Sequence, residues 1–209
     1  MSVDIRGAAW GVAPFSLNEG TNRVLPWANL DELIVTYAAP RATAPALTLF
    51  GPTDGGGTIT PTLIDWDVAT ATATYTYSSL QTGYYRVGTA NTNYDCGVLP
   101  CHSNGNGIVN FADFGVFGPS FGLNYLTGPP LPAPHIADYN GNGIINFADF
   151  GVFGPAFGSN LNAFTPPTGP APPPPPPAAS FAALAIDAAW ASIFDVDDDE
   201  DEVDSLLVV

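Results

Sequence analysis

The sequence predicts a mixed fold with an all-β sandwich at the N-terminus, followed by a small α-helical module and an unstructured C-terminal region. Three observations predict it. Short runs of β-branched and aromatic residues recur about every ten residues in the first half. A 21-residue segment is then duplicated, and prolines and carboxylates gather near the C-terminus. We therefore divide the chain into residues 1–98, 99–160, 161–180 and 181–209.

Composition and charge restrict the classes of function. The chain has 209 residues, with 20 acidic residues against four Lys or Arg and a net charge of −16. So acidic a chain cannot displace counterions from phosphates, and we expect neither nucleic acid nor an anionic membrane surface as a partner. The 22 glycines and 22 prolines argue against a helical bundle. No apolar stretch is long enough for a membrane span.

The first part, residues 1–98, is predicted to contain short strands at 33–37, 46–50, 62–66, 69–77 and 84–87. From Ala69 to Tyr77 the chain alternates strictly, so Ala and Tyr should face inwards and Thr outwards. The segment Leu80–Tyr85 has the spacing of a tyrosine corner, in which a Tyr bonds back across a turn. This pattern resembles the bacterial immunoglobulin-like domains of large surface proteins.

No catalytic constellation stands out in the sequence. Asp65 and Asp67 would share one face of a predicted strand, which we interpret as a solvated face because their neighbours are ordinary strand residues. The chain offers no Ser-His-Asp set and no phosphate-binding glycine loop. We therefore expect a protein that is not an enzyme.

The second part contains the duplication: residues 102–122 and 138–158 are identical at 17 of 21 positions. Both copies place oxygen-bearing groups at positions 1, 3, 5, 7, 9 and 12, the spacing with which one loop wraps around Ca²⁺. Position 6, which needs a positive φ, is Gly107 or Gly143. At position 8, the side chains of Val109 and Ile145 can turn towards the core. The alternative is a pair of Asn-Gly turns without metal. The candidate ligands are His102, Asn104, Asn106, the Ile108 carbonyl, Asn110 and Asp113 in the first copy, and Asp138, Asn140, Asn142, the Ile144 carbonyl, Asn146 and Asp149 in the second.

The duplicated loops, each ending in Asp at position 12 and followed by a short apolar helix, resemble a type I dockerin over residues 99–160. With a β domain before it and an acidic tail after it, the layout is similar to dockerin-bearing surface proteins of planctomycete-type bacteria. The resemblance implies two Ca²⁺ sites and a cohesin-like partner. The second site should be tighter, because position 1 of the first loop is His102 where the family has Asp.

The helices of the repeats raise two further expectations. We expect them to end at Gly118-Pro119 and Gly154-Pro155, because the residue before a proline is displaced from the α region. Positions 10 and 11 are Phe111-Ala112 and Phe147-Ala148, where many dockerins present hydroxyl residues to cohesin, so these four residues are candidates for partner binding. We expect the phenylalanines to form a shared core and the alanines to be exposed; an exposed aromatic face is the alternative. These phenylalanines are 111, 114, 117, 121, 147, 150, 153 and 157.

Two cysteines precede the first loop. A local disulfide between Cys96 and Cys101 would suit an oxidising, extracellular setting. The alternative is covalent attachment of a c-type haem, with His102 and His135 as axial ligands. A zinc site would need a fourth ligand, which the nearby sequence does not supply.

The C-terminal parts are expected to be a proline-rich linker at 161–180 and, at 181–209, a short helix with a disordered acidic tail. The N-terminal segment lacks the features of a signal peptide, so we expect either a cytosolic protein or the C-terminal part of a longer exported one. We expect an extracellular or cell-surface monomer that binds calcium and anchors its protein to a cohesin-type partner. The alternatives are a purely structural calcium-stabilised module and a haem electron-transfer protein.

Overall fold

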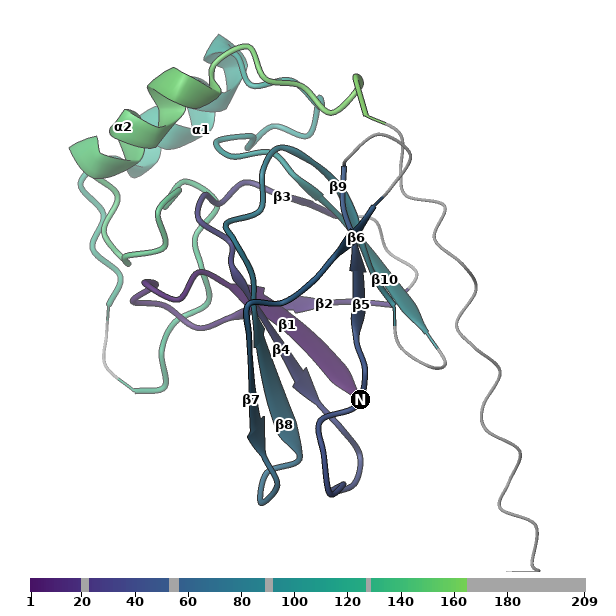
Figure 1. Ribbon diagram of the computed structural model, residues 1–209. Helices are drawn as coiled ribbons and strands as arrows, with labels where there is room; N and C mark the ends of the chain where they lie inside the picture. The colour runs from purple at the N-terminus through teal and green to yellow at the C-terminus, as the bar shows by residue number, and fades with distance from the viewer. Residues whose placement is uncertain (20–22, 53–56, 89–91, 127–128, 165–209) are drawn as a thin grey trace, which may run out of the picture. The chain divides into compact units, whose positions relative to one another are not determined.

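The computed structural model describes residues 1–19, 23–52, 57–88, 92–126 and 129–164 (Figure 1). All of them belong to one compact unit, Met1–Pro173. The expected proline-rich linker from residue 165 onwards, and the short helix and acidic tail expected at 181–209, lie outside the described residues. No helix in the described part is both long enough and apolar enough to cross a bilayer.

The N-terminal part is all-β, as predicted, and forms two five-stranded sheets (Figure 1). Every strand pair is antiparallel except β3 with β10, which is parallel. The first sheet has the order β2 (Phe15–Leu17), β1 (Ser2–Arg6), β4 (Glu32–Thr36), β8 (Thr72–Thr76) and β7 (Leu63–Asp67). The second has the order β3 (Arg23–Leu25), β10 (Asn93–Val98), β9 (Gly83–Gly88), β5 (Thr48–Phe50) and β6 (Thr58–Ile59).

The five predicted strands correspond to β4, β5, β7, β8 and β9, whereas the sequence pattern missed β1, β2, β3, β6 and β10. Alternation along β8 is as expected, with Ala73 and Tyr75 buried and the threonines half-buried. One buried cluster joins the inner faces of both sheets and includes Val3 and Leu33 from the first and Tyr85 and Val87 from the second. Burial of these apolar faces stabilises the β part.

The two helices follow the loops of the duplication and are α1 (Phe111–Ser120) and α2 (Phe147–Ala156). Each continues through its Gly-Pro pair, so the expected ends at Gly118-Pro119 and Gly154-Pro155 are wrong. The proline lies in the last turn and only one helical residue follows it. The missing N–H therefore costs one hydrogen bond at an end that frays readily.

A second buried cluster holds the repeats together and involves few of the helical rings. It consists of Leu99, Cys101, Val109, Phe117, Ala137, Tyr139, Ile145, Phe153 and Leu161. Val109 and Ile145 are fully buried, as predicted. Leu161 belongs to this cluster, and its N–H donates to the Gly107 carbonyl at 3.0 Å.

The predicted tyrosine corner is present in the second sheet. The hydroxyl of buried Tyr85 donates to the Gln81 carbonyl at 2.8 Å, across the turn that leads into β9. Burial is the main cause that raises the pKa of Tyr85, to about 12, so the hydroxyl stays protonated and remains a donor at neutral pH. This bond fixes the start of the central strand β9.

We expect Tyr85→Phe to lower the free energy of unfolding by about 1–3 kcal/mol, because the Gln81 carbonyl loses its partner while ring packing is retained. Urea unfolding followed by fluorescence measures the change. The control is Tyr84→Phe on the same strand, because the Tyr84 hydroxyl makes no hydrogen bond to another residue that the structure describes. Equal effects of the two substitutions would contradict a specific role for the corner.

Candidate functional site: the two loops of the duplication

The two loops are related by an approximate two-fold axis. At position 8, Val109 exchanges two backbone hydrogen bonds with residues 158–159 after α2, at 2.8 and 2.9 Å. Ile145 exchanges two with residues 122–123 after α1, both at 2.8 Å. At position 2, the hydroxyls of Ser103 and Tyr139 lie 2.9 Å apart. Each copy therefore completes the other, and neither loop is held by its own helix alone.

In the second loop, two fully buried carboxylates accept hydrogen bonds from backbone N–H groups. Asp149 accepts the N–H groups of Asn140 at 3.1 Å and Asn146 at 2.9 Å. Asp138 accepts those of Asn142 at 3.2 Å and Gly143 at 2.7 Å. Gly143 has a φ of 83°, the left-handed conformation predicted for position 6. The chain thus wraps around the two carboxylates in the manner of a cation loop.

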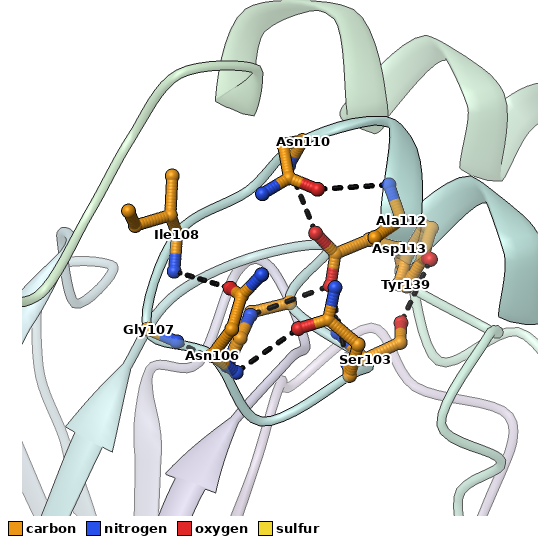
Figure 2. A network of polar contacts seen from close by, with 10 residues as sticks. Ser103, Asn106, Gly107, Ile108, Asn110, Ala112, Asp113 and Tyr139 are labelled. Atoms are coloured by element: carbon orange, nitrogen blue, oxygen red, sulfur yellow. Dashed lines mark hydrogen bonds and ion pairs between the residues drawn. The ribbon is translucent and has the colours of Figure 1, made fainter.

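The first loop repeats the arrangement around Asp113, which is also fully buried (Figure 2). Its carboxylate accepts the N–H groups of Ser103 at 2.7 Å, Asn104 at 3.1 Å and Asn110 at 2.8 Å. Gly107 at position 6 has a φ of 80°. Asn110 caps α1 by accepting the Ala112 N–H at 2.8 Å, as Asn146 caps α2. The same Asp therefore closes the loop and completes the capping box of the helix.

His102 occupies the place of Asp138 in the first loop. Its Nε2 accepts the Gly107 N–H at 3.1 Å, as Asp138 accepts that of Gly143. A neutral imidazole has a single acceptor nitrogen, so Nδ1 carries the proton; it is buried without a hydrogen bond, 3.3 Å from the Asp113 carboxylate. In this arrangement the predicted ligand His102 has no lone pair to offer an ion. The first loop therefore presents fewer groups that can bind a metal ion than the second.

The carboxylates of the second loop have no cationic neighbour in the described part of the chain. Arg6 pairs with Glu32 and Arg86 with Asp95, and the remaining arginines, Arg23 and Arg41, lie against aromatic rings. Burial is the main cause that raises the pKa of Asp149. The N–H groups of Asn146 and Asn140 oppose that rise, and neighbouring Asp138 adds to it. Two adjacent buried carboxylates without a counter-charge are costly unless a cation joins them.

The available donors suit a hard cation. No three His, Cys, Asp or Glu side chains converge within the described residues, so nothing there resembles a zinc-type cluster. The loops instead combine carboxylates with amide and carbonyl oxygens, which Ca²⁺ prefers. The amide oxygens of Asn140 and Asn142 each accept one backbone N–H, at 3.0 and 2.8 Å, which leaves each a second lone pair. The second loop fits Ca²⁺ on these grounds.

The β part contacts the second loop closely, whereas side chains of the first loop are exposed to solvent. Gly11 donates to the Gly141 carbonyl and Ala28 to the Tyr139 carbonyl, both at 2.8 Å. Trp10 lies so close to Gly141 that an added Cβ would come within 2.5 Å of its ring. In the first loop, Asn104 and Asn106 are exposed. The second loop is therefore the more preorganised of the two.

Sequence reasoning missed the residues outside the loops that complete this site. The Tyr125 hydroxyl donates to Asp138 at 2.7 Å and itself accepts the His135 N–H at 3.0 Å. Trp27 donates from its ring to the His135 carbonyl at 3.0 Å. These residues come from outside the repeat pattern, so no spacing in the sequence indicates them.

The phenylalanines differ from the expected shared core. Only Phe117 and Phe153 are buried. Phe111 and Phe147 are 79% and 77% exposed, and the other four are 40–45% exposed. The predicted core is wrong for these six rings because Val109, Tyr139, Ile145 and Leu161 fill the interior instead. Ala112 and Ala148 are exposed, as expected, so all four candidate partner-binding residues are accessible.

The two cysteines are separate thiols, which corrects the expected disulfide between Cys96 and Cys101. Cys96 is buried in the cluster of the β sheets, whereas Cys101 is buried among the repeats. Burial is the main cause that raises the pKa of both thiols, that of Cys96 to about 12. Thiols buried in two different clusters do not favour attachment of a single haem.

The acidic pair on the β part is solvated. Asp65 and Asp67 are both exposed on β7, as the sequence predicted. Asp67 accepts the Ala69 N–H at 2.8 Å and the Thr70 hydroxyl at 2.8 Å, and these bonds lower its pKa, that of Thr70 most. Its carboxylate serves the turn between β7 and β8.

Comparisons of the chain with family models, with characterised proteins and with solved structures give no match.

We expect the double substitution Phe111→Ser with Phe147→Ser to change the free energy of unfolding by less than about 1 kcal/mol, because both rings are mostly exposed. Phe117→Ala, the buried control on the same helix, should cost about 3–5 kcal/mol. Urea unfolding of the full chain in calcium measures both. Large destabilisation by the double substitution would restore the core interpretation.

Proposed function

We propose that this chain is a non-catalytic, calcium-binding interaction module of an exported protein, with an immunoglobulin-like β-sandwich before a dockerin-like tandem repeat. The observation that carries the proposal is the pair of buried carboxylates, Asp138 and Asp149, which no arginine approaches. A Ca²⁺ ion between them would supply the missing charge. It would also take up the free lone pairs of the loop amides and the Ile144 carbonyl.

The two sites should differ in affinity. The second loop has two carboxylates and is braced by Trp10, whereas the first has only Asp113, with His102 at position 1. Affinity of calcium loops depends on the number of charged ligands and on the rigidity of the site. We therefore assign the tighter site to residues 138–149 and the weaker one to residues 102–113.

The interaction role rests on the first turn of each helix. The two residues at positions 10 and 11 are exposed in both copies, so the approximate two-fold presents the same pair twice. Because Asp113 and Asp149 belong to both loop and helix, an ion in the loop would fix the start of the helix that shows these residues. The resemblance to dockerins makes a cohesin-type domain of a polysaccharide-degrading or cell-surface assembly the partner class to test.

A second candidate is a purely structural calcium module. The observation that favours it is the contact of the second loop with Trp10 and Gly11, through which an ion would also brace the β part. Pull-down with immobilised cohesin domains in calcium separates the two candidates. Capture that chelator reverses supports an interaction role, and calcium binding without capture of any cohesin supports the structural one.

We expect calcium to stabilise the chain. For a dissociation constant on the order of 10⁻⁴ M, about 10 mM Ca²⁺ should add about 2.7 kcal/mol to the free energy of unfolding, because the ion binds only the folded loop. Thermal unfolding with chelator and with calcium measures this. Asp138→Ala should abolish most of the gain, whereas Asp65→Ala, which removes an exposed carboxylate on β7, should not. Identical unfolding of the unaltered chain in both buffers would refute the proposal.

The first loop allows a gain-of-function test. We expect His102→Asp to tighten the weaker site by about tenfold, because it adds a carboxylate with free lone pairs where the imidazole has none. Calorimetric titration of the full chain should show this change at one site only. If the affinity of the first site does not change, position 1 is not a ligand position.

A further inference from the structure

The exposed phenylalanines of α1 and α2 form one continuous surface. We call the six exposed rings the phenylalanine face: Phe111, Phe114, Phe121, Phe147, Phe150 and Phe157. Ring centroids lie 5.0 Å apart for Phe111 and Phe157, 4.9 Å for Phe121 and Phe147, and 6.1 Å for Phe114 and Phe150. The buried rings Phe117 and Phe153 connect these pairs. The face is therefore a single patch with the approximate two-fold of the loops.

The face is large for a surface that stays in water. With about 200 Å² for a fully exposed phenylalanine, the exposed fractions amount to about 650 Å². The largest apolar patch on a typical monomer is about 300–600 Å², and each partner of a stable complex buries about 800 Å². The face therefore has nearly the area that one side of a protein interface needs.

Glycines make hollows beside the rings. Phe111, Phe114, Gly115 and Gly118 lie one turn apart on one stripe of α1, and α2 repeats the pattern. A Cβ added to Gly115 or Gly151 would meet no atom within 4 Å. Since glycine in a helix costs about 1 kcal/mol relative to alanine, internal packing does not explain these residues. A groove of about 400 Å³ runs beside Gly118, lined by Phe114, Phe117, Phe121, Phe147 and Phe150.

The chemistry of the face selects among possible occupants. The only ionisable side chains of the two helices, Asp113 and Asp149, are fully buried, so the face offers no charge for a complementary partner to recognise. Two copies that meet on this face bring no charged helical side chain into the contact, although each chain carries a net charge of −16 that opposes association at a distance. A symmetric dimer needs a patch that complements itself, with ridges and hollows together. Here Phe111 and Phe147 are the ridges and the glycine stripes are the hollows.

We propose that a second copy of this chain docks on the phenylalanine face, with Phe111 and Phe147 of each copy packed against the glycine stripes of the other. The proposal rests on the proposed function, because folded loops present the helices. It departs from the monomer expected from the sequence. Because Phe111 and Phe147 would be covered, self-association and binding of a cohesin-type domain would exclude each other.

Sedimentation equilibrium of the full chain in about 10 mM Ca²⁺, from about 1 to 200 μM protein, tests the proposal. The unaltered chain should approach twice its monomer mass of 21.7 kDa. Phe111→Ser with Phe147→Ser should raise the dissociation constant at least about tenfold. Leu63→Ser with Ile64→Ser is the matched control, because it removes exposed apolar groups from β7 and should leave the mass unchanged.

The glycine stripes give a second, independent variant. Gly115→Ala with Gly151→Ala should raise the midpoint of thermal unfolding, because alanine favours the helix, and yet weaken self-association by filling the hollows. Unchanged association of this variant would overturn the proposed packing, and so would a dimer lost only in the β7 control. A chain that remains monomeric at the highest concentration overturns the proposal. This holds even if a cohesin domain binds the phenylalanine face.

Calorimetry on the same samples separates this proposal from the calcium function. Calcium binding by a chain that remains monomeric refutes the dimer alone. Self-association of a chain that binds no calcium refutes the proposed calcium function and supports the dimer contact alone.

Discussion

The burial of loop carboxylates in a chain with no lysine is the constraint on which the repeat module depends. Asp113 and Asp149 are fully inaccessible, and each receives N–H groups from its loop and from the start of its helix. Backbone hydrogen bonds favour the ionised form, while burial opposes it. In the second loop Asp138 lies beside Asp149 and intensifies the conflict. This conflict between burial and ionisation is the physical basis for the calcium ion that we propose in the second loop.

The duplication supplies the buried apolar surface that a single copy lacks. One loop and one ten-residue helix bury too little apolar surface to be stable. Here position 8 of each loop pairs with the segment that follows the other helix, and Val109 and Ile145 fill the centre. With the centre occupied by loop residues, the helices lie at the outside and most of their rings face solvent.

Much of the fold and of the site was accessible from the sequence where a local pattern was strong. Alternation along β8, the corner at Tyr85 and the left-handed glycines at position 6 were all predicted, since each depends on a few neighbouring residues. The missed strands β2, β3 and β6 are only two or three residues long, and β10 contains Asp and Gly, so propensity could not indicate them. The exposure of the phenylalanines and the contact of Tyr125 with Asp138 depend on tertiary packing, which no spacing encodes.

Helix capping connects the two duplicated loops to the exposed phenylalanine face. Asn110 and Asn146 cap the helices, and Asp113 and Asp149 complete the capping boxes three residues later. The most exposed phenylalanine of each helix lies between these two residues, directly after the cap. Any change in the loop that moves the aspartate therefore moves the first turn and its ring, because one side chain belongs to both structures. In the proposed function, calcium binding would therefore be coupled to presentation of the phenylalanine face through a single residue in each copy, and Trp10 of the β part packs closely against the second loop.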